Sequence, residues 1–392
     1  MIAYDKKRLD NLLESEQAKC FSRLDLINKD ELRLIALAKQ PAYHHSNIFI
    51  RIGVLLLTII LTFCSYGLLV LFFGLDSEWG FKIALIIFSI ITFAALEFFI
   101  RNKNHFASGV DDGLLYFAFT CFATGVGFII EPDSSLQLLT FYAILFIVSL
   151  FAFIRYTDRL AAIVCFVTFL LAIFYLTSQL GDISKLIMPF VMMIISASIY
   201  LFVSKKKQKY GLRFWYNGLE VLQGASLLSF YASGNYYVVR EASVQFFNMQ
   251  LEPGEDIPLS IFFYAFTISI PLLYVYFGLK KKDAIFLNCG LILIVATIAT
   301  IRYYHSIMPI EIALILGGII LLSIAWFAYR LLKTPRNGFT IAEDKSESGW
   351  FSKDVEAIIM AQALAQQPAP PQADNNNFGG GKFGGGGAGE NF

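Results

Sequence analysis

Polar residues recur at helical spacing within an apolar stretch near the middle of the chain. Arg213, Asn217, Glu220 and Gly224 follow the spacing i, i+4, i+7 and i+11, and Gln223 flanks them. This spacing places the side chains near one face of a helix. A carboxylate on a polar stripe inside a membrane helix suits a proton or cation carrier, or a ligand for a polar solute. The alternative is a packing helix whose polar face is satisfied by neighbouring helices.

The composition indicates that the helix carrying this stripe is one of many in a membrane. The chain has 392 residues, of which 57% are hydrophobic and only 16% are charged, whereas an average soluble domain has about 25% charged residues. The apolar residues gather in long runs with almost no charge, as in transmembrane helices. These values exclude a soluble enzyme. A formal net charge of +1 also argues against a nucleic-acid binder.

The long apolar runs predict an all-α integral membrane protein with a bundle of about ten transmembrane helices. Each run is long enough to cross about 30 Å of hydrocarbon at about 1.5 Å per residue. The periodicity of amphipathic barrel strands is missing. The ten predicted spans are 52–74, 81–100, 113–130, 138–154, 160–177, 186–203, 212–231, 259–279, 284–301 and 309–331.

The distribution of Lys and Arg between the spans predicts the orientation of the chain. With ten spans, 27 of the 31 basic residues fall on one side and four on the other. If 212–231 did not cross, every later loop would change sides and the counts would become 20 and 11. Because basic residues concentrate in cytoplasmic loops, we expect ten spans with both termini in the cytoplasm.

The chain divides into four predicted regions. Residues 1–47 form a cytoplasmic helical module, in which Asn28 and Glu31 have the spacing of a capping box. Residues 48–332 are the transmembrane domain. Residues 333–367 are a cytoplasmic segment with a short amphipathic helix, and 368–392 are a Pro, Asn and Gly-rich tail expected to be disordered.

The C-terminal regions contain candidate partner-binding residues. Three apolar residues share one face of the predicted short helix, and three phenylalanines are spaced along the Gly-rich tail, where aromatic side chains can act as weak binding positions. The alternative for the tail is a passive, solvated tether. These candidates are Val355, Ile358, Ile359, Phe378, Phe383 and Phe392.

Other acidic residues near the spans have local structural explanations. Glu97 precedes Arg101 by four residues near a predicted cytoplasmic helix end, which indicates an interfacial ion pair. Ser108 and Asp111 have capping-box spacing at the start of the third span, where Asp112 is also favoured by the helix dipole.

Two segments carry a resemblance to known proteins. The capped N-terminal helix pair, the following Arg51-Ile-Gly-Val-Leu-Leu-Leu span and the Gly113-Leu-Leu-Tyr116 segment resemble uncharacterised bacterial multi-pass membrane proteins with a short cytoplasmic N-terminal module. The Phe-Gly-Gly-Gly repeats resemble the tails of bacterial TPM-domain membrane proteins, although the TPM domain itself is missing. These resemblances imply a bacterial protein of the inner membrane.

The sequence favours a non-enzymatic function. No nucleophile and base set, phosphate-binding loop or metal-ligand spacing is evident, so we expect no catalytic residues, no metal and no cofactor. The leading hypothesis is a membrane scaffold or adaptor that binds cytoplasmic proteins through its ends. The alternative is a small-solute or ion transporter, coupled to protons, with Glu220 at its centre. The expected partners are the lipid bilayer and a cytoplasmic protein, without nucleic acid, and the oligomeric state stays open.

Overall fold

The computed structural model describes residues 2–24, 26–39, 48–73, 77–207, 209–246 and 256–304, together with single helical positions between 312 and 330. Within these residues the secondary structure is helical and contains no strand. The predicted all-helical class is therefore confirmed for this part of the chain. The C-terminal candidates Val355, Ile358, Ile359, Phe378, Phe383 and Phe392 lie outside the described residues, as do the predicted regions 333–367 and 368–392.

Helices occupy the first nine predicted spans, and the tenth lies largely outside the described residues. Seven of the described helices, α3 to α8 and α11, are long and apolar enough to cross a membrane, so the chain is a multi-pass membrane protein. The helices after the N-terminal pair are α3 (Ile48–Phe73), α4 (Glu78–Lys103), α5 (Val110–Ile130), α6 (Ser135–Tyr156), α7 (Arg159–Ser178), α8 (Asp182–Lys206), α9 (Tyr216–Gly234), α10 (Tyr236–Gln245), α11 (Ser260–Lys281) and α12 (Ala284–Tyr304).

The seventh predicted span differs from the others. Residues 212–231 were expected to form one helix, but a 3₁₀ helix, η1 (Tyr210–Trp215), precedes α9. Helix α9 is not among the seven apolar helices because its polar residues lower its hydropathy. The count of ten spans and the cytoplasmic position of both termini thus stay predictions.

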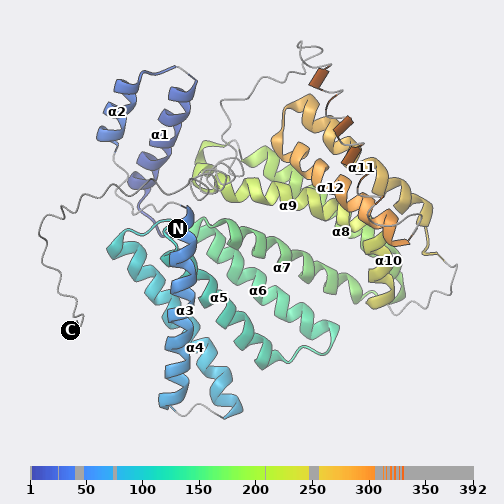
Figure 1. The fold of residues 1–392 in the computed structure, drawn as a ribbon. Coiled ribbons are helices and arrows are strands. Elements are labelled where there is room, and N and C mark those ends of the chain that lie inside the picture. Colours follow the sequence, from blue (N-terminus) through green and yellow to red (C-terminus); the bar gives the residue numbers. More distant parts are fainter. Residues whose placement is uncertain are drawn as a thin grey trace, which may run out of the picture. The chain divides into compact units, whose positions relative to one another are not determined.

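Consecutive helices pack as antiparallel pairs (Figure 1). The closest pairs are α4 with α5, α6 with α7, α8 with α9, and α11 with α12. Helix α3 packs mainly on α5, and α7 packs on α9. Short connections between apolar helices favour this arrangement, because each helix meets its sequence neighbour first.

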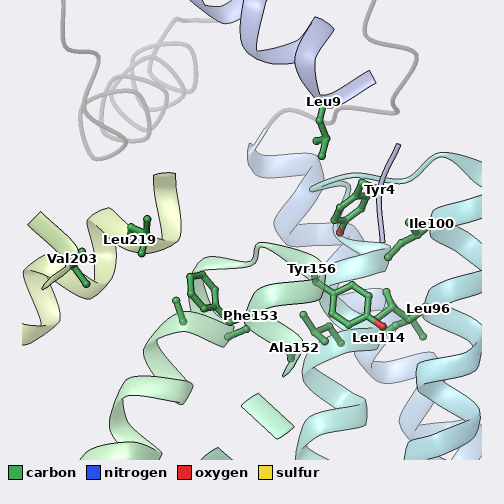
Figure 2. Close-up of a cluster of buried hydrophobic side chains, with 13 residues drawn as sticks. Tyr4, Leu9, Leu96, Ile100, Leu114, Ala152, Phe153, Tyr156, Val203 and Leu219 are labelled. Carbon is green, nitrogen blue, oxygen red and sulfur yellow. The ribbon is translucent and has the colours of Figure 1, made fainter. Parts of the chain in front are cut away.

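The N-terminal module is a helical hairpin. Its helices are α1 (Lys6–Arg23) and α2 (Lys29–Ala38). The predicted capping box is confirmed, since the Asn28 amide donates to Glu31 Oε2 at 2.8 Å and the reciprocal bond is also present. Two residues at the start of the chain, Tyr4 and Leu9, join a core cluster with side chains of α4 to α9 (Figure 2). The module is therefore packed on the membrane domain.

Two prolines do not break their helices. Pro189 lies inside α8 and Pro271 inside α11, and both helices continue through them. The real break lies at Asn235, which ends α9 and caps the start of α10. Neighbouring helices can satisfy the backbone groups that a proline frees in a membrane helix, which explains why the prolines are tolerated.

Candidate functional site

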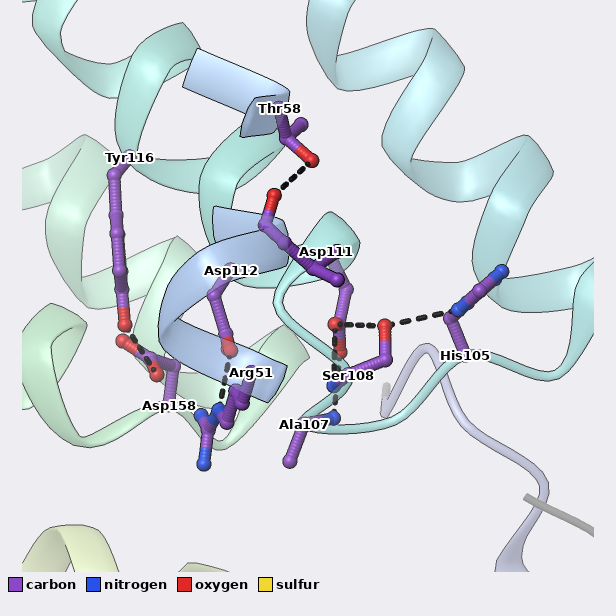
Figure 3. Close-up of polar contacts among 10 residues, drawn as sticks. Arg51, Thr58, His105, Ala107, Ser108, Asp111, Asp112, Tyr116 and Asp158 are labelled. Atoms are coloured by element: carbon purple, nitrogen blue, oxygen red, sulfur yellow. Dashed lines mark hydrogen bonds and ion pairs between the residues drawn. The ribbon is translucent and has the colours of Figure 1, made fainter. Parts of the chain in front are cut away.

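A charged cluster forms where α3, α5 and α7 begin (Figure 3). It consists of Arg51, Asp111, Asp112, Tyr116 and Asp158. Arg51 is in the first turns of α3, Asp111 and Asp112 are in the first turn of α5, and Asp158 is the N-cap of α7. Helix N-termini favour carboxylates because the first amide groups are unpaired and the dipole is positive there. Local helix chemistry thus accounts for each aspartate.

The ion pair between Arg51 and Asp112 joins α3 to α5. The guanidinium Nε donates to Asp112 Oδ2 at 2.6 Å. The Asp112 side chain is only 7% exposed, whereas Arg51 is 35% exposed. Because a buried carboxylate without a cation would be strongly destabilising, Arg51 fixes the start of α3 against α5.

A close backbone contact brings these helices together. Gly109, at φ +95°, lies so near Arg51 that a Cβ built on it would be 2.4 Å from the Arg51 carbonyl oxygen. One helical turn later, a Cβ on Gly113 would be 2.9 Å from the Thr58 Cβ. The pair therefore has the spacing of small residues that lets membrane helices approach closely.

Asp111 organises the turn that precedes α5. Its Oδ2 accepts from the Ala107 amide at 2.7 Å, and its Oδ1 accepts from the Ser108 amide and hydroxyl, both at 2.9 Å. His105 Nδ1 lies 2.9 Å from the same hydroxyl. The predicted capping interaction between Ser108 and Asp111 exists in this form, although Gly109 is the N-cap residue.

Asp158 joins α7 to α5. Its Oδ1 accepts from the Ala161 amide at 2.8 Å, and its Oδ2 accepts from the Tyr116 hydroxyl at 3.0 Å. Burial raises the pKa of the Asp158 carboxyl above its ordinary value, and these two donors only partly oppose that effect. Like Asp111, Asp158 is therefore bonded to uncharged donors in the contacts described above, whereas Asp112 is bonded to a guanidinium.

The N-terminal segment Ile2–Tyr4 packs against this cluster. The Ala3 amide donates to the Arg155 carbonyl at 2.9 Å, and the Tyr4 ring meets Phe106 edge to face at 4.9 Å. Tyr4 is only 8% exposed. Burial, followed by the charges of Asp111 and Asp112, raises the pKa of Tyr4 well above its ordinary value. The carboxylates of Asp111 and Asp112 are therefore close enough to affect the pKa of the Tyr4 hydroxyl.

A second ion-pair group lies at the ends of α4 and α6. Arg155 binds Glu97 through two nitrogens, with Nε to Oε1 at 2.5 Å and Nη2 to Oε2 at 2.7 Å. The Tyr156 hydroxyl donates to the same carboxylate at 2.8 Å. The predicted pair between Glu97 and Arg101 is present at 3.3 Å. Glu97 thus links two helices as well as pairing within its own.

Another polar network lies where α9 breaks. Asn235 Nδ2 donates to the Tyr231 hydroxyl at 2.9 Å and to Thr300 Oγ1 at 3.2 Å. The Tyr231 hydroxyl lies 2.8 Å from Thr297 Oγ1, and the Tyr236 amide donates to Thr267 Oγ1 at 3.0 Å. These buried contacts stabilise the joint of α9 and α10 against α11 and α12.

The predicted polar stripe is divided in the structure. Arg213 lies in η1 and pairs with Asp10 of α1 at 2.6 Å. Asn217 is exposed, Glu220 is half-buried, and Gln223 is buried at 1% exposure. Within the described residues, Gln223 Oε1 has no hydrogen-bond partner. The stripe therefore does not continue along one helix from Arg213, although Glu220 and Gln223 remain one turn apart on α9.

Sequence reasoning singled out two aspartates of the charged cluster but missed its other members and every contact between its helices. Asp111 and Asp112 were assigned to helix capping alone, and Arg51 and Asp158 were not recognised as parts of a site. Arg51 is 61 residues from Asp112, and Tyr116 is 42 residues from Asp158. The Gly109-x-x-x-Gly113 spacing could have predicted the contact between α3 and α5. It was overlooked because the predicted span began at residue 113 and so excluded Gly109.

The described residues contain no group of three His, Cys, Asp or Glu side chains that could hold a metal ion. Comparison with protein-family models, curated proteins and solved structures finds no match to any of them. By its own residues, the chain is a helical multi-pass membrane protein whose N-terminal hairpin is packed on the membrane domain beside a buried charged cluster.

Proposed function

We propose that the protein is a non-enzymatic membrane scaffold or adaptor that presents the α1–α2 hairpin to a cytoplasmic protein. The observation that carries this proposal is the contrast between the two ends of the hairpin. At its start, Tyr4 and Leu9 are buried against the membrane domain. At its end, α2 has no buried residue. The hairpin is thus attached at one end and available for contact at the other.

Exposed leucines on the hairpin support a binding role. Leu26 and Leu34 are both 67% exposed and Leu37 is 60% exposed. They lie outside the membrane-spanning helices, so the bilayer interior does not account for their exposure. Leu34 and Leu37 are three residues apart on α2 and so share a face of that helix, and an exposed apolar face outside the membrane is typical of protein contacts.

The groove between α1 and α2 favours an acidic partner. It has a volume of about 270 Å³ and an apolar floor that includes Leu32 and Ile35. Its lining contains Lys19, Lys29 and Arg33 but no acidic side chain. A partner segment that combines apolar and acidic side chains would complement it.

The cytoplasmic orientation belongs to this proposal. It is supported by the 27 basic residues that the ten-span arrangement places on one side. Location in a bacterial inner membrane is supported only by the resemblances described above. The C-terminal candidates, including Phe378 and Phe392, would be a second contact for partners.

Crosslinking and affinity purification from native membranes test the scaffold function. The doubly substituted Leu34→Asn and Leu37→Asn protein should lose a near-stoichiometric protein that wild type retains, and the partner should rebind purified wild type directly. A matched Glu16→Gln substitution on the exposed face of α1 should leave recovery unchanged. A second version truncated after Lys333 tests the tail. Recovery of the same proteins with all versions, or of the bait alone, would contradict the proposal.

A transporter is the second candidate, and Gln223 favours it. An unpaired buried acceptor, one turn from the Glu220 carboxylate, is suited to a solute with donor groups or to a cation. In a flux assay with reconstituted vesicles, Glu220→Gln and Gln223→Leu should each lower transport severalfold, whereas Asn217→Ala should not. Equal flux in all variants would exclude this site.

A further inference from the structure

We propose that the end of the bundle where α8 and α11 finish and α12 starts is a binding site for the phosphodiester headgroups of anionic phospholipids. The site consists of two groups of consecutive lysines and the aromatic rings beside them. It goes beyond the scaffold function, because it needs neither a protein partner nor the α1–α2 hairpin. The first lysine group is Lys205, Lys206 and Lys207 at the end of α8, and the second lysine group is Lys280, Lys281 and Lys282 at the end of α11.

Ring contacts place the two lysine groups at the same end of the packed helices. The Phe286 ring, in the first turn of α12, meets the Tyr200 ring of α8 edge to face at 5.3 Å. The Lys281 ammonium lies 5.9 Å from the centre of the same Phe286 ring. Lys206 follows Tyr200 on α8 by six residues, which is about 9 Å along the helix axis. Both lysine groups therefore extend from one end of α8, α11 and α12.

Exposed aromatic rings place these lysines at the level of lipid headgroups. The Lys206 ammonium lies 5.4 Å from the centre of the Phe202 ring, which is 62% exposed. The Lys280 ammonium lies 5.7 Å from the centre of the Tyr276 ring, which is 50% exposed. Helices α8 and α11 are both long and apolar enough to cross a membrane, so rings exposed near their ends meet lipid. Aromatic rings gather at the membrane interface, and lysines there extend their ammonium groups toward the headgroups.

No carboxylate neutralises the two lysine groups within the part of the chain that the structure describes. None of their six ammonium groups forms an ion pair there. Asp283, which directly follows the second lysine group, accepts instead from the Ile285 and Phe286 amides at 3.0 and 3.4 Å and so caps α12. By contrast, Arg213 of the neighbouring η1 pairs with Asp10. The lysine groups therefore form a cationic surface that an external anion can compensate.

A phospholipid headgroup is the anion that suits this surface. Like charges that are close together repel each other, and a bound phosphodiester relieves that repulsion. Clusters of about four to eight basic residues directly beside membrane helices are typical of anionic lipid binding. The acyl chains would contact exposed apolar side chains near the same helix ends, such as Leu201 and Leu279. Free phosphate lacks these apolar contacts, so the surface favours the lipid.

Native mass spectrometry of the full-length protein released from nanodiscs tests the proposal. The nanodiscs contain equal parts of phosphatidylcholine and phosphatidylglycerol with matched acyl chains, so the two lipids differ only in the headgroup. Each lysine beside an anionic bilayer contributes about fivefold in affinity. We therefore expect the wild type to retain phosphatidylglycerol over phosphatidylcholine by about fivefold or more. Equal retention of the two lipids would overturn the proposal.

Three variants assign the preference to the lysines. Replacing the second lysine group by glutamine should lower the lipid ratio severalfold, whereas replacing it by arginine keeps the charge and should keep the ratio. A control with the same change in net charge should retain the wild-type ratio. An unchanged ratio in the first variant, or an equal loss in the control, contradicts the site. The control carries Lys6→Gln, Lys7→Gln and Lys29→Gln, at three exposed lysines of the hairpin.

A competition experiment distinguishes a lipid from a soluble phosphate as the ligand. Glycerophosphoglycerol has the headgroup of phosphatidylglycerol without its acyl chains. Added in amounts equal to the lipid, it should leave the bound phosphatidylglycerol in place, because it lacks the apolar contacts. Displacement of the lipid would show that the lysines bind phosphate without a membrane and would contradict the assignment to a lipid.

Discussion

At the scale of single residues, the charged cluster shows how a membrane protein can retain carboxylates inside its packing. Asp111 and Asp158 are satisfied largely by amide and hydroxyl donors near helix starts, and Asp112 is satisfied by a guanidinium. Charged hydrogen bonds of this kind are short and stronger than neutral ones. The cluster therefore joins helices as well as capping them.

Removing the charge of Asp112 tests this role. Asp112→Ala leaves Arg51 without its partner and should destabilise the protein by about 1–3 kcal/mol, between the values for exposed and buried ion pairs. Thermal unfolding in a single detergent measures the change. Glu78→Gln provides the control, because Glu78 pairs with Lys82 while 76% exposed and should leave the Tm unchanged. Equal Tm values for wild type and Asp112→Ala would contradict the stabilising role.

The sequence shows which residues inside the apolar segments are polar, but it does not show which residues they contact. The pair of Glu97 with Arg101 follows from helical spacing and is confirmed. The stronger contact of Glu97 with Arg155 spans 58 residues, and no local pattern connects them. The same limit explains why Arg213 was assigned to a membrane stripe when it contacts Asp10, 203 residues earlier.

At the scale of helices, close backbone contact determines how α3 meets α5. Gly109 has a left-handed backbone angle that other residues adopt only with strain, and it also touches the α3 backbone. Helix α3 packs mainly on α5 and has a second contact at Tyr66 against α4 and α5, so the joint at Gly109 fixes the start of the helix. A change there should loosen α3 without unfolding the rest.

Gly109→Ala should therefore cost about 1–3 kcal/mol from backbone strain, with added overlap against Arg51. Crosslinking between cysteines placed on α3 and α5 should fall, and the Tm should drop. Gly53→Ala on α3 is the matched control, because nothing lies within 4 Å of a Cβ at that position. If both alanine variants behave alike, the close contact does not stabilise the joint.

The joint between α9 and α10 gives an independent test at the same scale. Asn235→Ala removes the cap of α10 and two buried hydrogen-bond contacts, so it should destabilise by about 1–3 kcal/mol. Hydrogen exchange of α10 amides should increase before exchange elsewhere. Asn217→Ala, at an exposed site on the same helix pair, should change neither quantity. Unchanged exchange in Asn235→Ala would show that the joint is held by apolar packing.

Helix positions were predictable because apolar runs of membrane length have one stable conformation in lipid. The predicted first spans differ from α3 and α4 by only a few residues at each end. The interruption of 212–231 by η1 and the break at Asn235 were missed, since both depend on contacts with α1, α11 and α12.

At the scale of the whole molecule, the hairpin and the membrane domain meet at one end of the helices. The starts of α5 and α7, the ends of α4, α6 and α8, and helix α9 contribute side chains to the core cluster that Tyr4 and Leu9 join. The scaffold function requires this end to face the cytoplasm, where a protein partner could reach α2. The scaffold function therefore depends above all on the orientation of the chain in the membrane.

Labelling of single cysteines with a membrane-impermeant maleimide in intact and permeabilised cells tests this requirement. Cys20 lies on α1, and a cysteine introduced for exposed Asp133 lies in the turn between α5 and α6, at the opposite end of those helices. We predict that Cys20 reacts only after permeabilisation and that the Asp133→Cys site reacts in intact cells. Labelling of Cys20 in intact cells, with Asp133→Cys protected, would contradict both the orientation and the scaffold function.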